Sequence, residues 1–274
     1  MSFINPDYFI LISTAKPFLA YIMQKKEFLI IAHRGESYDA PENTLASMNL
    51  AWKRDADGVE IDVQLTKDDK IVLIHDKTTL RTGGKYKRIA SNNYDELLKI
   101  DVGKFKNTKW KNERIPLLDE VIDTIPKNKI LFVEIKSDDR IIKPLQNLIE
   151  QKNINPAQIK FIGFNINTMK VLKENFPEIG TYWIVEGKNY KTKDHLKQTI
   201  TKCLSTRLDG LDVQARKYLN KDVIHSVQNS GLKIYTWTVD DPERAKQLYL
   251  DGIDGITTNR ACWLKNKLKE RNII

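Results

Sequence analysis

The chain has 274 residues, of which 41% are hydrophobic and 30% are charged. These values and a mean hydropathy of -0.46 are typical of one large globular domain, and they exclude a membrane-embedded body or a disordered chain. The formal net charge of +9 suits anionic partners such as phosphate-bearing small molecules, lipid surfaces or nucleic acid. Because the lysines are spread along the chain, a solvated basic surface is the favoured interpretation.

The N-terminal segment, residues 1–27, contains an apolar run that is interrupted by Lys16-Pro17. The run is shorter than the roughly 20 residues of a spanning helix, and it lacks the charged start and cleavage site of a signal peptide. We therefore expect a helix packed on the domain of a cytoplasmic protein. The alternative is an export signal, and with it an exported or periplasmic protein. Cys203 and Cys262 are too few and too far apart for a zinc cluster, and one disulfide between them stays open.

Apolar segments alternate with amphipathic ones along the rest of the chain. Strands are expected at 28–32, 58–65, 71–75, 130–135, 159–163, 180–185, 209–213, 233–238 and 254–257. Helices are expected at 43–54, 117–125, 139–152, 167–175, 194–205, 218–229, 241–250 and 259–271. This alternation predicts parallel βαβ units. About eight such units in about 250 residues fit a (β/α)8 TIM barrel, here residues 28–274, better than an open sheet.

One expected strand is surplus to an eight-stranded barrel. Residues 58–65 and 71–75 are joined by five residues, which is too short for a parallel crossover. They should therefore form a hairpin, and a turn centred on Asp68-Asp69 would place Asp62 opposite His75. Even a slip of one or two residues would return His75 close to the acidic residues of the preceding strand. The gap that follows, 76–116, has little periodicity and is interpreted as an active-site insertion, an excursion over the mouth of the barrel.

Three carboxylates lie inside apolar strand segments. Glu60 and Asp62 are two residues apart and so point to the same face of a strand, and Glu134 lies within another strand. Inward carboxylates in a barrel need a cation or partner to neutralise them, and an all-oxygen set favours Ca²⁺ or Mg²⁺ over Zn²⁺. The alternatives are an outward-facing pair on the first strand and a salt bridge between Glu134 and a lysine.

Two histidines, His33 and His75, each close an apolar strand. A lone histidine there is often structural, but two that converge on carboxylates indicate a general base and a general acid. Arg34 and Lys136 offer fixed positive charge for a phosphate, although an ion pair with Glu42 is an alternative role for Arg34. No nucleophile elbow, P-loop or dinucleotide fingerprint is present, and no motif supports nucleic-acid binding.

The order of short motifs over about residues 28–260 resembles the glycerophosphodiester phosphodiesterase family. The motifs are His33-Arg34-Gly35, Pro41-Glu42-Asn43-Thr44, Glu60-x-Asp62, Leu65-Thr66-x-Asp68, His75-Asp76, Leu80-Arg81-Thr82-x-Gly84, Glu134-Ile135-Lys136, Trp237-Thr238-Val239-Asp240 and Gly252 to Thr258. Each is weak alone, and their number and order make the resemblance specific.

The resemblance implies a (β/α)8 barrel, like that of the phosphoinositide-specific phospholipases C, that hydrolyses a glycerophosphodiester to sn-glycerol 3-phosphate and an alcohol. It implies that the glycerol 2-hydroxyl attacks phosphorus and that water opens the cyclic phosphate. The implied roles are acid/base catalysis for His33 and His75, divalent-cation binding for Glu60, Asp62 and Glu134, phosphate binding for Arg34 and Lys136, and the glycerol pocket for Trp237. The alternatives are a membrane-lipid-directed phospholipase of the same barrel type and a non-catalytic phosphate-binding barrel.

The chain departs from the family pattern at two places. After the last strand the family usually has Thr-Asp-x-Pro, whereas this chain has Thr258-Asn259-Arg260-Ala261. We expect that strand to contribute little to the metal cluster, so the departure concerns pocket detail. Gly163-Phe164 replaces a common Ser-Phe, which we expect to affect the substrate range.

Overall fold

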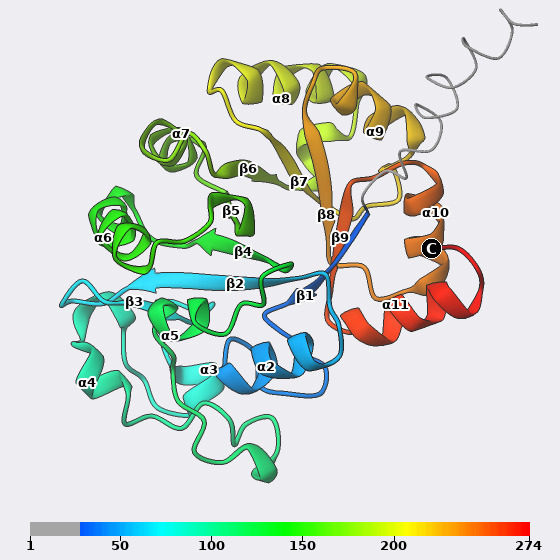
Figure 1. The fold of residues 1–274 in the computed structure, drawn as a ribbon. Coiled ribbons are helices and arrows are strands. Elements are labelled where there is room, and N and C mark those ends of the chain that lie inside the picture. The colour runs from blue at the N-terminus through cyan, green and yellow to red at the C-terminus, as the bar shows by residue number, and fades with distance from the viewer. Residues whose placement is uncertain (1–27) are drawn as a thin grey trace, which may run out of the picture.

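Eight parallel strands form a closed barrel in the computed structural model, which describes residues 28–274 (Figure 1). The strands of the barrel are β1 (Leu29–His33), β2 (Gly58–Leu65), β4 (Ile130–Ile135), β5 (Ile159–Gly163), β6 (Gly180–Val185), β7 (Gly210–Gln214), β8 (Lys233–Trp237) and β9 (Gly255–Thr258). Each pairs in parallel with the next, and β9 returns to β1. The predicted (β/α)8 barrel is confirmed. The helix expected within residues 1–27 lies outside the described residues, and the cytoplasmic location stays a prediction.

Helices surround the barrel in Figure 1. They are α2 (Leu45–Lys53), α5 (Leu118–Ile122), α6 (Ile142–Lys152), α7 (Ile166–Asn175), α8 (Lys193–Ser205), α9 (Lys221–Gln228), α10 (Pro242–Leu250) and α11 (Ala261–Glu270). Local sequence sets where they begin. Thr44 and Ser47 form a capping box at α2, and Asp241 caps α10 ahead of Pro242 at the first helical position, where proline loses no hydrogen bond.

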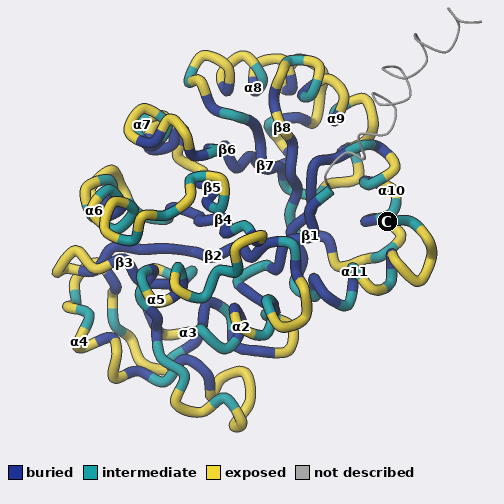
Figure 2. Tube along the Cα trace, in the orientation of Figure 1, coloured by how far each residue is buried: buried dark blue, intermediate teal, exposed yellow. Residues whose placement is uncertain are grey.

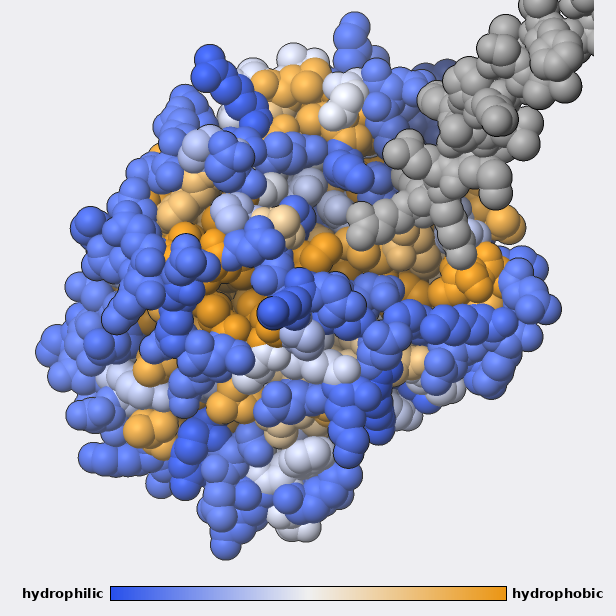
Figure 3. Space-filling model, viewed as in Figure 1, coloured by the Kyte–Doolittle hydropathy of each residue, from blue (hydrophilic) through white to orange (hydrophobic). Residues whose placement is uncertain are grey.

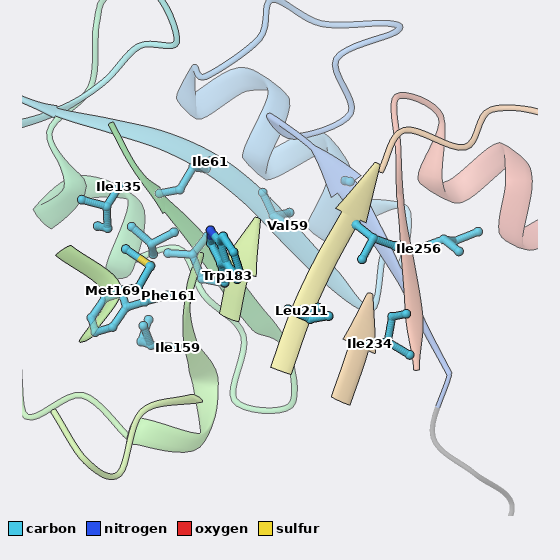
Figure 4. Packing of buried hydrophobic residues seen from close by; sticks show 14 of the residues in the cluster. Val59, Ile61, Ile135, Ile159, Phe161, Met169, Trp183, Leu211, Ile234 and Ile256 are labelled. Atoms are coloured by element: carbon cyan, nitrogen blue, oxygen red, sulfur yellow. The ribbon is translucent and has the colours of Figure 1, made fainter. Parts of the chain in front are cut away.

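The strands bury both of their faces, as Figure 2 shows by the dark strands inside helices with exposed outer sides. One face packs against the helices, and Figure 4 shows Val59, Ile61, Leu211 and Ile256 among these side chains. The other face fills the barrel with a separate apolar cluster. Its members are Leu29, Ile31, Phe132, Ile162, Tyr182, Ile184 and Tyr235. Because alternate residues share a face, the inward positions continue into polar residues at the carboxyl ends of the strands.

The predicted hairpin is present, and its register differs by one residue from the expectation. Strand β3 (Ile71–Leu73) pairs antiparallel with β2, with Val63 opposite Leu73. Asp62 is thus level with Ile74, whose N–H donates to the Asp62 carbonyl at 3.0 Å, and the predicted pairing of Asp62 with His75 is wrong. The cause is a three-residue turn in which Asp69 adopts the left-handed conformation, φ 56°, instead of a two-residue turn.

The excursion, residues 76–116, has more structure than its sequence indicated. It contains α3 (Leu80–Gly83), α4 (Tyr94–Leu97) and the 3-10 turns η2 (Ile89–Ser91) and η3 (Thr108–Trp110). Residues of β3 and of the excursion share a small core of their own, formed by Val72, Ile74, Ile89, Leu97, Ile100, Val102 and Ile115. Lys106 Nζ and Trp110 Nε1 donate to carbonyls of the loop after β1, at 2.7 and 3.2 Å. The excursion is therefore anchored beside β1, and its role in substrate access stays a prediction.

Hydrophilic residues dominate the face of the molecule seen in Figure 3, with hydrophobic residues gathered toward its middle. Among residues 28–274, no helix combines the length and apolar character that crossing a membrane requires. Cys203 and Cys262 are buried free thiols, so the disulfide that the sequence left open does not form here.

Candidate active site

A small pocket opens at the carboxyl ends of the barrel strands and encloses about 100 Å³. It is lined by His33, Arg34, Glu60, His75, Glu134, Lys136, Ile162, Phe164, Ile184, Asp212, Trp237 and Thr257. All but two of the residues singled out from the sequence are therefore in its wall. The exceptions are Asp62, which is fully buried beside Glu60, and Glu42, which pairs with Arg34. No residue of the excursion, residues 76–116, lines this pocket.

The three predicted carboxylates meet, with one oxygen from each of Glu60, Asp62 and Glu134 lying within 4.8 Å of the others. Strand register explains the meeting, because Asp62 is aligned with Glu134 across the β2–β4 pair. Glu60 and Glu134 are 3% and 8% exposed and Asp62 is 0% exposed, which rules out the alternative of an outward-facing pair. Burial of like charges at this spacing is costly unless cations lie nearby.

The environment separates the three carboxyl groups. Burial and the neighbouring carboxylates raise the pKa of Glu60 well above its usual value. Burial and Asp62 raise the pKa of Glu134 to about 7 in spite of the nearby Lys136. Burial would also raise the pKa of Asp62, but the opposing charges of Arg34 and Lys136 lower it to about 2. Of the three, Asp62 therefore most favours the charged form, whereas burial favours the neutral form of the two glutamates.

Asp62 is held by two ion pairs and by hydrogen bonds with Asn43. Arg34 Nε and Lys136 Nζ lie 3.0 and 3.1 Å from its oxygens. Asn43 Nδ2 donates to Asp62 Oδ2 at 2.8 Å, and the Asp62 N–H donates to Asn43 Oδ1 at 3.0 Å. Asparagine and threonine are both typical helix-capping residues. Thr44 has that role, whereas Asn43 fixes the central carboxylate.

The carboxylate cluster fits a divalent cation. Its donors are all oxygens, which hard cations prefer, and they come from rigid strands of the barrel. Glu60 Oε1 is buried and has no hydrogen-bond partner among the described residues, which leaves an acceptor turned toward its two neighbours. The remaining Glu60 oxygen accepts from the Arg34 N–H at 2.9 Å, so the side chain is already oriented.

His33 is oriented by a chain of hydrogen bonds that begins in the last barrel loop. Asp240 accepts from Asn259 Nδ2 at 2.7 Å and from the Asn259 N–H at 2.8 Å, which turns Asn259 Oδ1 toward His33 Nδ1, 2.7 Å away. An amide oxygen only accepts, so His33 Nδ1 carries the proton. Nε2, which lies 4.0 Å from Glu60 Oε2, is the basic nitrogen. Burial, and then the charge of Arg34, lower the pKa of His33.

His75 has a different partner. Its Nδ1 lies 2.7 Å from Asp76 Oδ1. Asp76 is held in turn by Arg81, whose Nε donates to Oδ2 at 2.7 Å. Arg81 also binds both oxygens of Glu42 at 2.7 and 2.8 Å, and this chain of ion pairs leads back to Arg34. The two imidazoles thus have partners of different charge.

Two fixed cations face the pocket together with the carboxylates. Arg34 makes the alternative ion pair with Glu42, at 2.8 Å, and a second one with Asp62. Lys136 pairs with Glu134 at 2.6 Å, which was the alternative role of that glutamate, and with Asp62. These pairs leave Arg34 and Lys136 in the pocket wall, so structural pairing and phosphate binding do not exclude each other at these positions.

Aromatic side chains form the opposite wall. The rings of Trp237 and Phe164 meet edge to face with centroids 5.9 Å apart, and Lys136 Nζ lies 5.8 Å from the Phe164 ring centroid. Sequence reasoning identified Trp237 and missed Asp212, and it noted Phe164 and Asn259 only as departures from the family pattern. The strand periodicity could have indicated Asp212, which is an acidic residue inside an apolar strand segment, like Glu134.

A closed parallel barrel that brings imidazoles, carboxylates and fixed cations into one pocket defines an enzyme of the barrel class that acts on an anionic substrate. The model of the glycerophosphoryl diester phosphodiesterase family matches residues 33–262. The chain belongs to this family.

Relatives support the same assignment along the chain. YhdW of Bacillus subtilis (strain 168) is 33% identical over 247 residues, covering 89% of this chain and 99% of that one. A glycerophosphodiester phosphodiesterase of Caldanaerobacter subterraneus subsp. tengcongensis is 31% identical, with 84% and 93% covered. A phosphodiesterase of Oleispira antarctica, solved in complex with the product sn-glycerol-3-phosphate, has a TM-score of 0.78 at 26% identity, with 88% and 96% covered.

Proposed function

We propose that the protein hydrolyses glycerophosphodiesters to sn-glycerol 3-phosphate and an alcohol, with His33 as the general base and His75 as the general acid. The observation that carries the assignment of roles is the difference between their partners. His33 pairs with the neutral amide of Asn259, whereas His75 pairs with the carboxylate of Asp76. Two imidazoles whose hydrogen-bond partners differ in charge suit opposite roles in one acid-base reaction.

In the first step the free Nε2 of His33 takes the proton of the glycerol 2-hydroxyl while its oxygen bonds to phosphorus. The bond from phosphorus to the leaving alcohol breaks, and the departing oxygen takes the proton of His75. The product is a cyclic phosphodiester of glycerol. Acid-base assistance of this kind contributes about 10²- to 10⁴-fold for each group.

In the second step the two histidines exchange roles. His75, now neutral, takes a proton from water as the water oxygen bonds to phosphorus. The bond to the glycerol 2-oxygen breaks, and that oxygen regains its proton from His33. The enzyme returns to its starting protonation state, and sn-glycerol 3-phosphate is released.

Charge in the pocket makes an anionic diester accessible to an attacking oxygen. Arg34 and Lys136 would bind the non-bridging phosphate oxygens, since both are held by carboxylates and present fixed donors. Glu60, Asp62 and Glu134 would hold Ca²⁺ or Mg²⁺, which supplies further positive charge at the phosphate. Trp237 and Phe164 would pack against the carbon chain of the glycerol.

A release assay tests the proposal. Purified protein is freed of metal with excess chelator and incubated with glycerophosphocholine, -ethanolamine, -glycerol or -inositol, each with Ca²⁺ or Mg²⁺ in turn, and sn-glycerol 3-phosphate is quantified. We expect release from at least one substrate, its loss in chelator and its recovery with one cation. Absence of release from all four, or full activity in excess chelator, would contradict the proposal.

The membrane-lipid alternative needs its own assay. Vesicles of phosphatidylcholine, with and without phosphatidylinositol, are incubated with the protein at low and high salt, and both co-sedimentation and lipid cleavage are measured. If the natural substrate is soluble, we expect no cleavage of the vesicle lipid and no binding to vesicles that persists at high salt. Cleavage of the vesicle lipid in preference to the four soluble diesters would favour the alternative.

A further inference from the structure

Asp212 is a buried acid in the pocket wall to which the steps above assign no role. It lies on β7, is 3% exposed, and lines the same pocket as His33 and His75. Its Oδ1 is buried without a hydrogen-bond partner among the described residues. The residues level with it on the neighbouring strands are Ile184 and Tyr235, and no cationic side chain within residues 28–274 forms an ion pair with it.

The packing of the barrel does not explain an acid at this position. The inward residues level with it on the two neighbouring strands, Ile184 and Tyr235, belong to the apolar cluster inside the barrel, and an aliphatic side chain would satisfy the same neighbours. Burial, and then the charge of Glu134, raise the pKa of Asp212 well above its usual value, which reflects the cost of an unpaired buried carboxyl group. Residues that cost stability inside a binding pocket are typical of ligand contacts.

The position of Asp212 within the pocket indicates what it contacts. The carboxylate cluster and both histidines come from β1, β2, β4 and the hairpin, whereas Asp212 comes from β7 on the far side of the closed barrel. The pocket that separates Asp212 from the carboxylate cluster is small, about 100 Å³, and Ile162, Ile184 and Trp237 also line it. This space suits the three-carbon glycerol unit better than a headgroup.

We propose that Asp212 binds the terminal hydroxyl of the glycerol moiety, the hydroxyl that does not attack phosphorus, and thereby selects glycerol esters over other phosphodiesters. This inference rests on the proposed function. A hydroxyl both donates and accepts, so it pairs with the carboxyl group in either protonation state. With the nucleophilic 2-hydroxyl held near His33, the terminal hydroxyl is the group that points to the β7 wall.

A substrate that lacks only this hydroxyl tests the proposal. Glycerophosphocholine is compared with the phosphocholine ester of propane-1,2-diol, which keeps the 2-hydroxyl, and kcat/KM is measured for wild type, Asp212→Ala and Asp212→Asn. Wild type is expected to be about 10- to 100-fold less efficient on the deoxy substrate. Asp212→Ala is expected to lose about the same factor on glycerophosphocholine and less than about threefold on the deoxy substrate.

Controls separate binding from damage to the fold. Asp212→Asn keeps a polar group of the same shape and is expected to recover most of the loss. Asp209→Ala removes an acid that pairs with Lys173 just before the same strand, and its discrimination between the two substrates should equal that of wild type. The melting temperature of Asp212→Ala should equal or exceed that of wild type. Equal losses on both substrates, or a lower melting temperature with no change in discrimination, would overturn the inference.

A binding measurement keeps the test independent of catalysis. Calorimetry compares sn-glycerol 3-phosphate with the 1-phosphate of propane-1,2-diol, which lacks only the terminal hydroxyl, on wild type and Asp212→Ala. A weaker affinity for the deoxy ligand in wild type alone supports the inference, and equal affinities in wild type overturn it. Absence of hydrolysis of every glycerophosphodiester by wild type would count against the proposed function, while this measurement would still decide the role of Asp212.

Discussion

Replacing Asn259 with alanine should slow the reaction without weakening substrate binding. Asn259 Oδ1 accepts from His33 Nδ1 at 2.7 Å, and Asp240 fixes the direction of the amide. In Asn259→Ala the imidazole keeps its position on β1 but loses the partner that selects its rotamer and tautomer. Only the fraction of molecules with Nε2 free and aimed at the substrate remains competent.

The magnitude follows from one hydrogen bond to a largely buried ring. Losing such a bond, and leaving its donor unsatisfied, costs about 1–3 kcal/mol, which corresponds to about 5- to 150-fold in kcat. KM should change by less than about threefold, since phosphate binding is assigned to other residues. Burial and Arg34 lower the pKa of His33, and the Asn259 bond partly offsets them. Loss of the hydrogen bond to Asn259 should therefore leave the acidic side of the pH profile of kcat/KM unchanged or shift it to lower pH, and should not shift it to higher pH.

The assay is steady-state kinetics on glycerophosphocholine between pH 5 and 9, with Asn220→Ala as the matched control. Asn220 also accepts one hydrogen bond, from the Val223 N–H at 3.1 Å at the start of α9, so its loss costs about 1 kcal/mol of stability and should not affect kcat. A kcat for Asn259→Ala within twofold of wild type, or an equal loss in both variants, would refute the reasoning.

Three further predictions concern the remaining residues of the site. His33→Ala and His75→Ala should each lower kcat at least about 100-fold and leave the circular dichroism spectrum unchanged. The control variant His225→Ala, on α9, should keep wild-type kinetics. Near-normal turnover of His33→Ala or His75→Ala would count against the role of that histidine. Lys136→Met removes the only cation paired with Glu134 among the described residues and one of the two paired with Asp62. It should lower the free energy of unfolding of the metal-free protein by about 3 kcal/mol in urea titrations, with part of the loss recovered on adding Ca²⁺. No change would show that the ion pairs are not stabilising. The pKa of Glu134 is raised to about 7, so protons compete with the cation, and the measured Kd for Ca²⁺ should rise as pH falls from 8 to 6; a Kd independent of pH would contradict this.

The sequence was most informative where local spacing decides geometry. Glu60 and Asp62 are two residues apart on a strand and had to share a face. Each predicted strand and helix of the barrel is present because apolar periodicity and capping residues act over a few positions. The hairpin was predicted for the same reason, since five residues cannot make a crossover.

Long-range register was harder to predict. Glu134 reaches Asp62 because β2 and β4 align these two residues, and Asn259 reaches His33 across 226 positions of sequence. Neither of these two contacts can be predicted from the periodicity of the sequence. The hairpin register was wrong by one residue because a single left-handed residue, Asp69, lengthened the turn. Asp212 was overlooked although it is an acidic residue inside an apolar strand segment, and only the packed structure shows that its Oδ1 has no hydrogen-bond partner among the described residues.

The central claim is that Glu60, Asp62 and Glu134 hold one divalent cation beside two catalytic imidazoles. Calorimetric titration of the chelator-treated protein with Ca²⁺ and with Mg²⁺ tests it most directly. We predict one binding site per chain for at least one of the two ions, which disappears in Asp62→Asn and Glu60→Gln but persists in His33→Ala. Absence of binding in wild type, or equal binding in the carboxylate variants, would contradict the claim.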